Sequence, residues 1–410
     1  MAGLRLPYNE AYMAGIRNHS IKLMTSKHKQ TKISPRQKVF VGMSGGVDSS
    51  VSAALLKDEG YEVTGVFIKT WQPEGFPCSW KDERRDAMRV CAELEIPFLT
   101  LDLEKEYKKD VVDYMIAEYS KGKTPNPDVM CNKHIKFGAF YDWAIDNGAD
   151  YIATGHYSRI GMRQIPNHKY QIPNKSQIEN LKSSEKEYEL LKGIDEEKDQ
   201  SYFLWQIRRE QLAHVIFPIG EYKKSEVRKL AEKFNLSTAG KKDSQGICFI
   251  GKLDMKDFLS QYLNPKRGIV LNMAGEQVGT HNGAILYTIG ERRGFEITEK
   301  NPHTPPMYVV SKDIDANTIT VSESESNIFE KSLNNTKVDI CSANWISGEP
   351  FPAREYSVRF RYRQKLLRCN VQKEGDCWAI KLLGESVACA PGQSAVIYDK
   401  DTCLGGGVIM

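Results

Sequence analysis

Short apolar runs alternate with amphipathic segments over the first part of the chain. The short runs, which are typical of buried strands, cover residues 39–41, 61–67, 98–103 and 151–154. Between them, apolar residues recur at helical spacing around residues 87–94, 107–119 and 136–145. This alternation predicts a parallel sheet with helices on both faces.

A different pattern begins near Gly268, where short strands are separated by glycine turns. The predicted strands include residues 269–271, 284–287, 308–310 and 318–321. Further on, Tyr356, Val358, Phe360 and Tyr362 alternate with Ser357, Arg359, Arg361 and Arg363. One strand is therefore expected to turn its apolar face to a core and to carry three arginines on the other face. Such a stripe is either a solvated surface or a site for RNA phosphates.

The composition limits the possible domain number, location and partners of this protein. The 410 residues favour two or three domains, and 40% hydrophobic with 27% charged residues is ordinary for a soluble protein. No apolar run has membrane-spanning length, so no membrane association is expected. Nine cysteines without a C-x-x-C pair argue against a disulfide framework, a zinc ribbon or another structural metal site, and favour a reducing compartment. A net charge of +4 is too small to prove a nucleic-acid partner.

The first 38 residues contain eight Lys or Arg and a single acid, Glu10. We interpret this segment as a disordered basic tail. A transit peptide, which is also basic and poor in acids, is an alternative, and so is a tail that attracts RNA. The polar stretch 161–189 is interpreted as an insertion or a loop between two elements.

The turn after the first strand reads Ser44-Gly45-Gly46-Val47-Asp48-Ser49 and leads into an apolar helix. A strand that turns through glycines into a helix directs several backbone N–H groups at one point, which favours phosphate. The Lys-Ser/Thr pair of the Walker loop and the G-x-G-x-x-G spacing are both absent. Asp48 brings a negative charge to this turn, so it either binds Mg²⁺ beside the phosphates or caps the helix.

Two further stretches are expected on the same edge of the sheet. Gly155-His156-Tyr157 follows a predicted strand directly, and ligands of such sheets bind beyond the carboxyl ends of the strands. In the stretch 124–137, two prolines precede Cys131, which falls near a helix start with Lys133, His134 and Lys136 close by. Those cations and the helix start favour the thiolate, so we interpret Cys131 as reactive rather than as a small packing residue.

The remaining cysteines lack such surroundings. The apolar neighbours of Cys248, within 240–251, favour a structural role on local grounds. Cys91 lies on the apolar face of a predicted helix. Packing roles are also predicted for Cys341, Cys369, Cys377, Cys389 and Cys403. The stretch Lys198-Asp199-Gln200-Ser201 precedes an aromatic segment and by itself predicts only a helix cap.

Five ordered motifs together resemble a known family. The loop 44–49 resembles the pyrophosphate loop of the ATP pyrophosphatase superfamily, and the whole chain from about Val39 resembles the tRNA-specific 2-thiouridylases. The other motifs are 125–133, 153–157, 198–201 and 246–251. The resemblance implies an α/β, parallel-sheet nucleotide-binding domain of the ATP pyrophosphatase type, a small central α+β domain and a C-terminal β-barrel. The expected bounds are a basic extension at 1–37, the catalytic domain at 38–217, the central tRNA-binding domain at 218–303 and the barrel at 304–410.

The same resemblance assigns roles to residues. For ATP it implies Gly42, Met43, Ser44, Gly45, Gly46, Val47, Asp48, Ser49, the backbone of Ile68, and Gly155. For the target base it implies Asn126, Pro127 and Asp128, and for other parts of the tRNA it implies His156, Lys198, Asp199, Gln200, Arg361, Tyr362 and Gln393. Tyr362 has the core-facing parity of its strand, whereas Arg361 has the outward parity. Cys131 is implied as the nucleophile, Cys248 as the persulfide carrier and Asp128 as a further catalytic residue.

The implied function is ATP-dependent 2-thiolation of the wobble uridine of tRNA, with Mg²⁺ and a sulfur-donor protein. A cytoplasmic monomer is expected, with the mitochondrial matrix as the alternative compartment. Two rival functions are a small-molecule ligase, which needs neither Cys131 nor Cys248, and a non-catalytic RNA-binding protein, against which the intact loop argues. An iron–sulfur cluster on Asp128, Cys131 and Cys248 is left open.

Overall fold

The structure is a computed structural model that describes residues 36–75, 80–164, 186–243, 255–298, 305–323, 337–384, 387 and 389–410. Residues Gln37–Met410 form one compact unit. No helix among the described residues is long and apolar enough to cross a membrane.

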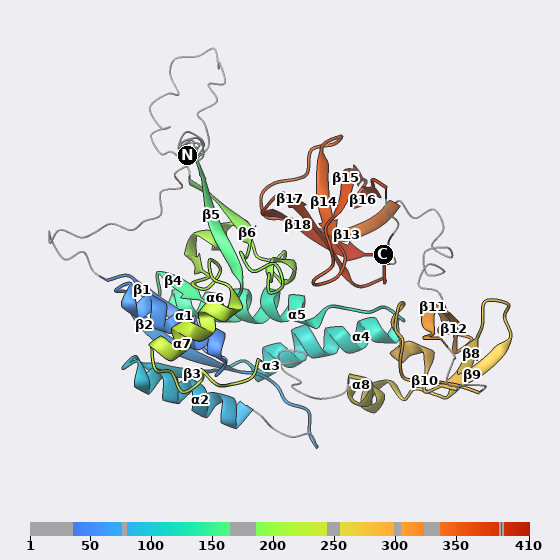
Figure 1. Cartoon of the computed structure of the whole chain (residues 1–410), viewed down its shortest axis with the longest axis horizontal. Coiled ribbons are helices and arrows are strands. Elements are labelled where there is room, and N and C mark those ends of the chain that lie inside the picture. Colours follow the sequence, from blue (N-terminus) through green and yellow to red (C-terminus); the bar gives the residue numbers. More distant parts are fainter. Residues whose placement is uncertain are drawn as a thin grey trace, which may run out of the picture. The chain divides into compact units, whose positions relative to one another are not determined.

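The first sheet is parallel, as predicted. Its order is β3-β2-β1-β4-β7, and each neighbouring pair runs in the same direction. Figure 1 labels β1 to β4 of this sheet. The strands are β1 (Lys38–Gly42), β2 (Glu62–Lys69), β3 (Phe98–Asp102), β4 (Tyr151–Ala153) and β7 (Val215–Ile216). The carboxyl ends of β1 and β4 therefore meet at one edge, which brings the loop after Gly42 beside Gly155.

Helices cover both faces of this sheet because side chains alternate along β1. Val39 and Val41 pack into a core with α1 (Val47–Asp58), α2 (Trp80–Glu93) and α7 (Lys224–Lys233). Phe40 packs into the opposite core with α3 (Glu104–Tyr107), α4 (Tyr114–Ser120) and α6 (Phe140–Asp146). The two predicted helices on that side are confirmed, and each includes a π-helical segment, Lys108–Asp113 and Cys131–Ala139.

The central region holds α8 (Met255–Leu263) and a second sheet of order β10-β9-β8-β12-β11. Its strands are β8 (Gly268–Leu271), β9 (Gln277–His281), β10 (Phe295–Ile297), β11 (Tyr308–Asp313) and β12 (Thr318–Ser322). Since β12 pairs with β8, residues 308–322 belong to this sheet and not to the barrel, so the predicted boundary at 304 does not match the strand pairing.

The strand predicted at 284–287 is wrong. Ala284–Leu286 form a 3₁₀ turn, in which Leu286 N–H donates to Gly283 and Tyr287 N–H to Ala284. Ala284, Leu286 and Tyr287 are buried, and a short apolar run does not distinguish a buried turn from a buried strand.

The C-terminal strands form the predicted barrel. They are β13 (Lys337–Trp345), β14 (Glu355–Arg359), β15 (Leu367–Glu374), β16 (Cys377–Leu382), β17 (Ser394–Asp399) and β18 (Thr402–Ile409). The order is β13-β16-β15-β14-β17-β18, and pairing of β13 with β18 closes it. The hairpin of β5 (Ser158–Gln164) and β6 (Lys186–Lys192) extends the sheet through β18, so both ends of the predicted loop 161–189 are strands.

The predicted arginine stripe is also wrong, because β14 ends at Arg359. The Arg359 side chain is only 10% exposed and donates to Asp199 at 2.9 Å. After it the chain turns, and Arg363 has a φ of +62°. Arg361 and Arg363 are exposed in this turn, so the strict alternation of a strand does not apply beyond residue 359.

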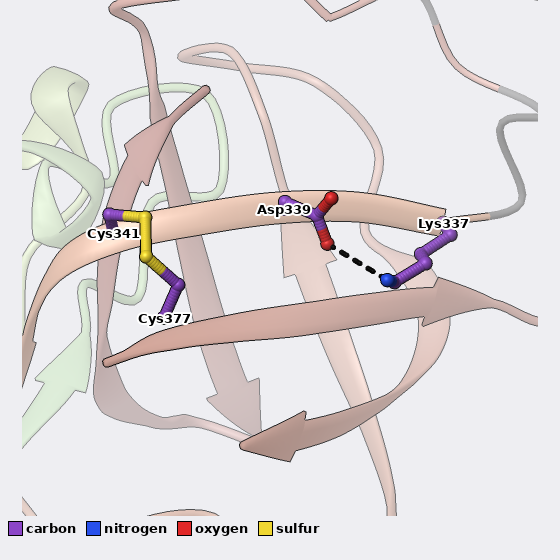
Figure 2. The surroundings of a disulfide bond; sticks show 4 residues. All are labelled: Lys337, Asp339, Cys341 and Cys377. Atoms are coloured by element: carbon purple, nitrogen blue, oxygen red, sulfur yellow. Dashed lines mark ion pairs between the residues drawn. A yellow bond between two sulfur atoms is a disulfide. The ribbon is translucent and has the colours of Figure 1, made fainter. Parts of the chain in front are cut away.

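Two barrel cysteines form a disulfide, although packing roles were predicted for them. Figure 2 shows Cys341 on β13 bonded to Cys377, the first residue of β16. These strands are antiparallel neighbours, and Ile340 lies opposite Trp378. Cys341 and Cys377 therefore lie opposite each other, with their Cα atoms 4.5 Å apart. Cys91, Cys369 and Cys403 are buried and form no disulfide, as predicted, and Cys389 is partly exposed.

Candidate active site

The loop between β1 and α1 has the geometry of an anion site. Ser44 N–H donates to Ser49 Oγ at 3.2 Å, and Gly46 N–H donates to Ser44 Oγ at 3.3 Å. Gly45 has a φ of +71°, and a Cβ there would lie 2.3 Å from the carbonyl oxygen of Glu83. Gly46 is the N-cap of α1, a position whose following N–H groups have no partner within the helix.

Gly155 lies against this loop, as expected for two stretches on the same edge of the sheet. A Cβ at Gly155 would lie 2.7 Å from Ser49 N and 2.8 Å from the carbonyl carbon of Asp48. A glycine at this point therefore allows the end of β4 to approach the start of α1. Ile68 is partly buried on the neighbouring strand β2.

The Asp48 side chain does not cap the helix, and its carboxylate accepts hydrogen bonds from two other side chains. Lys224 Nζ donates to its Oδ1 and Oδ2 at 2.7 and 2.8 Å, and the Tyr157 hydroxyl donates to Oδ1 at 2.8 Å. Burial and the Asp48 charge both raise the pKa of Tyr157, so its hydroxyl stays protonated and donates.

The site can accommodate Mg²⁺ only together with phosphate oxygens. The described hydrogen bonds leave acceptor capacity on Asp48 Oδ2. Mg²⁺ at nucleotide sites commonly takes one or two carboxylates and the rest of its ligands from phosphates and water, so this donor set fits. Among the described residues, no group of three or more His, Cys, Asp or Glu could hold an ion by itself.

The segment 197–201 joins the phosphate loop to the barrel. Gln200 exchanges hydrogen bonds with the backbone of Tyr157, both at 2.9 Å. Lys198 Nζ donates to Asp243 at 2.8 Å, and the Asp199 carboxylate accepts from Arg359. Asp199 is 2% exposed and also accepts the N–H groups of Gly193 and Ser201, so its carboxylate orders the segment, and the implied direct contact with tRNA does not fit.

Four of the residues implied for tRNA surround one cavity of about 470 Å³. It is lined by Asn126, Tyr202, Phe203, Thr288, Ile289, Gly290, Glu291, Arg361, Tyr362, Ala390 and Gln393. Arg361 donates to the Ile289 carbonyl at 3.1 Å, and the rings of Tyr362 and Phe203 lie 4.7 Å apart. Tyr362 thus faces the cavity, whereas strand parity had predicted a core position.

Barrel residues fix the approach to Cys131. Gln393 Nε2 donates to the carbonyl oxygens of Thr124 and Pro125 at 2.9 and 3.3 Å. Asn126 then caps α5 (Pro127–Met130) by accepting from Val129 N–H. This arrangement sets where Pro127 and Asp128 lie at the helix start.

Cys131 follows α5 directly and is 3% exposed. The predicted helix start is confirmed, but a packing cysteine would be buried as well, so its reactivity stays a prediction. Burial lowers the pKa of Lys133, and burial with the Lys133 charge lowers the pKa of His134. His134 therefore contributes less positive charge to this region at neutral pH than the sequence had indicated.

Three family models match consecutive parts of the chain. The tRNA methyl transferase HUP domain matches residues 37–252, the tRNA methyl transferase PRC-barrel domain 256–323, and the Aminomethyltransferase beta-barrel domain 335–409. The tRNA-specific 2-thiouridylase MnmA of Streptococcus thermophilus is 42% identical over 378 residues, which is 91% of this chain and 95% of that protein. The Bacillus subtilis protein of the same name is 42% identical, over 91% of this chain and 94% of its own.

The chain belongs to the family of tRNA-specific 2-thiouridylases. A third relative, from Lysinibacillus sphaericus, is 42% identical over 93% of this chain and 96% of its own. The resemblance drawn from the five motifs is thereby confirmed, as is the order of a parallel-sheet domain, a central domain and a β-barrel.

Two of the implied residues, Cys248 and His156, remain to be located. Cys248 lies outside the described residues, so neither its persulfide role nor a cluster with Asp128 and Cys131 is tested. His156 is buried, with Nδ1 2.7 Å from Thr154 Oγ1 and Nε2 3.4 Å from Lys136 Nζ. Burial, aided by the Lys136 charge, lowers the pKa of His156 well below its usual value, so the ring is neutral.

Sequence reasoning missed the residues that hold this site together. Lys224, Arg228 and Asp243 form ion pairs around the phosphate loop, and residues 288–291 line the cavity. The sequence Lys223-Lys224-Ser225-Glu226 looks like an ordinary solvated helix start. Nothing local distinguishes Lys224 from Lys223.

Proposed function

We propose that this protein is a tRNA-uridine 2-sulfurtransferase. It adenylates O2 of the wobble uridine with ATP and then replaces that oxygen by sulfur, giving 2-thiouridine, AMP and pyrophosphate. The observation that carries the proposal is the link, through segment 197–201, between a phosphate loop and a cavity lined by the residues implied for tRNA. Tyr362 joins the cavity to this segment, because its hydroxyl lies 3.5 Å from the Lys198 carbonyl oxygen.

ATP binds along residues 42–49, with the backbone of Ile68 and Gly155 closing the site. The N–H groups at the start of α1 and the Ser44 and Ser49 hydroxyls stabilise the charge that develops on the departing pyrophosphate. Mg²⁺, held by the phosphates and Asp48, would add Lewis acidity there. Attack of the uracil O2 on the α-phosphate forms one O–P bond and breaks the bond to pyrophosphate.

The target base is placed by Asn126, Pro127 and Asp128 at the start of α5. Arg361, Tyr362 and Gln393 contact neighbouring tRNA from the cavity, and Lys198 and Gln200 do so from the connecting segment. Asp199 and His156 have structural roles in this region and do not contact the tRNA. Burial of the Asp199 carboxylate and of the His156 ring favours this division of roles.

Sulfur comes from a persulfide on Cys248, loaded by a donor protein. In one route the Cys131 thiolate attacks Cys248 Sγ, the S–S bond breaks, and the released hydrosulfide displaces AMP from C2. In the other, the terminal persulfide sulfur attacks C2 and displaces AMP, and the Cys131 thiolate then attacks Cys248 Sγ, which breaks the S–S bond and leaves the sulfur on C2. Both routes leave a Cys131–Cys248 disulfide, which an external thiol must reduce.

The protein acts as a monomer in the cytoplasm or, if residues 1–37 are a transit peptide, in the mitochondrial matrix. The test is mass spectrometry of nucleosides from unmodified tRNA incubated with protein, ATP, Mg²⁺ and a persulfide source. We expect 2-thiouridine, with AMP formed in equal amount. AMP formation without thiouridine would contradict the proposal and favour a ligase on the same loop. Release of ADP would contradict both, because each of them cleaves ATP to AMP and pyrophosphate.

A further inference from the structure

Lys224 lies between two carboxylates from distant parts of the chain. Its Nζ donates to both oxygens of Asp48 at 2.7 and 2.8 Å and lies 3.0 Å from Asp243 Oδ1. The Lys224 side chain is 14% exposed, so water and salt screen these ion pairs only partly. Its backbone N–H donates to Asp195 at 2.8 Å, which fixes the start of α7.

Asp243 is held by two further cations. Lys198 Nζ donates to its Oδ2 at 2.8 Å and Arg228 to its Oδ1 at 2.6 Å. Burial opposes ionisation of Asp243, but the hydrogen bonds from Lys198 and Lys224 outweigh it and lower the pKa of this carboxyl to about 2. The carboxylate is therefore charged throughout the neutral pH range.

The backbone before Asp243 is fastened to the phosphate loop. Arg228 donates to the carbonyl oxygens of Ala239 and Lys241 at 2.9 and 2.7 Å. Lys241 Nζ in turn donates to the carbonyl oxygen of Gly45 at 3.0 Å and to Asp86 at 2.7 Å. Side chains from α7 thus hold residues 239–243 against the loop.

This network contains three cations, Lys198, Lys224 and Arg228, and three carboxylates, Asp48, Asp243 and Asp195, the last of which accepts the Lys224 N–H. The ammonium groups of Lys224 and Lys241 both contact the loop, at Asp48 and at the Gly45 carbonyl, so an anion bound at the N–H groups of the helix start would lie near two cations. The charged oxygens of polyphosphate at the loop would attract both ammonium groups.

We propose that Lys224 is a positioning residue of the nucleotide site. It holds the Asp48 carboxylate and, through Asp243, couples the phosphate loop to residues 239–243. The inference rests on the proposed ATP site. When the phosphates are bound, the positive groups of the network are held more firmly, and so is the segment that they fasten. Because such coupling is reciprocal, the same network strengthens ATP binding.

The test combines ATP affinity with hydrogen exchange. Full-length wild type, Lys224→Met and Lys229→Met, an exposed lysine of the same helix, are compared by calorimetric ATP titration with and without Mg²⁺. Amide exchange of residues 239–243 is measured with no ATP and at saturating ATP. In the wild type and in Lys229→Met, ATP should slow that exchange. In Lys224→Met, ATP affinity should fall about 10- to 100-fold, and the protection should be lost even at saturation.

Two additional variants keep the test decisive. Lys224→Arg retains a cation and should recover part of the protection. Asp243→Asn is close in shape to the native residue and should lose the protection even if Lys224→Met does not fold. Unchanged protection in folded Lys224→Met or in Asp243→Asn, with normal ATP binding by the wild type, would overturn the inference alone. Absence of ATP binding by the wild type would overturn both the proposed ATP site and this inference.

Discussion

At the scale of single residues, the two cysteines with proposed chemistry are separable by experiment. Cys131→Ser should still accept a persulfide on Cys248, visible as a mass gain of one sulfur, yet form no thiouridine. Cys248→Ser should accept no sulfur but should still consume ATP in the presence of tRNA. Each variant is the control for the other, with intact-protein mass spectrometry and peptide mapping as the measurement. Thiouridine formation by either variant would show that the roles are assigned incorrectly.

Lys312, on β11, predicts a pH dependence of stability in the central region. Its Nζ donates to the Tyr287 carbonyl at 2.7 Å, and burial lowers the pKa of Lys312 from 10.5 to about 8, against the attraction of Glu291. The unfolded chain therefore binds more protons than the folded one between these values, and stability rises with pH there. Relative to Lys312→Met, the wild type should gain about 1–3 kcal/mol in free energy of unfolding across that interval.

Urea denaturation of the wild type and of Lys312→Met at a series of pH values measures this gain. A constant difference between the two proteins from neutral pH to pH 10 would contradict it.

At the scale of elements, the end of β14 separates one structural arginine from two exposed ones. Arg359 forms a buried pair with Asp199, and removing one partner of such a pair costs about 3–5 kcal/mol. Arg359→Ala should therefore destabilise the protein by that order. Arg361→Ala with Arg363→Ala should leave stability nearly unchanged but reduce the salt dependence of tRNA binding by about 0.7–0.9 log units per lost phosphate contact.

Denaturation curves and tRNA titrations at several salt concentrations distinguish these two effects. An Arg359→Ala protein as stable as the wild type would mean that the ion pair with Asp199 contributes little. An unchanged salt slope in the double variant would mean that Arg361 and Arg363 lie on an ordinary solvated surface.

At the scale of the whole molecule, contacts between separate parts of the chain shape the cavity. Thr124 N–H donates to the Pro391 carbonyl at 2.8 Å, and Gln393 donates to Thr124 and Pro125. The barrel therefore orients the segment that ends at Cys131. Gln393→Ala should lower the rate of thiolation about tenfold or more while ATP affinity stays unchanged, because a small misplacement at a reacting centre is costly.

The matched control for this prediction is Gln372→Ala, an exposed glutamine on β15. Single-turnover thiolation with preloaded sulfur and calorimetric ATP titration are the measurements. Equal loss of thiolation in both variants, or a parallel loss of ATP affinity in Gln393→Ala, would contradict a specific role in orienting residues 124–131.

The sequence by itself determined the parts of this protein that depend on local pattern. The apolar run Val39, Phe40 and Val41 predicted a strand buried on both faces, and the glycines and serines from 44 to 49 predicted a phosphate-binding turn. These features follow from backbone geometry and from neighbours within a few residues, so a linear pattern carries them. The same holds for the alternating barrel strands, but not for where β14 ends.

Only the tertiary structure decided which charges meet. Lys224 and Asp48 are 176 residues apart, Arg359 and Asp199 are 160 apart, and Gln393 lies 269 residues from Thr124. Arg359 occupies the same kind of position in the alternating sequence as the exposed Arg361. It is buried because Asp199 lies within hydrogen-bonding distance. A side chain finds such partners through the packing of the whole chain, because the free energy of an ion pair or hydrogen bond depends on burial and distance in space and not on sequence separation.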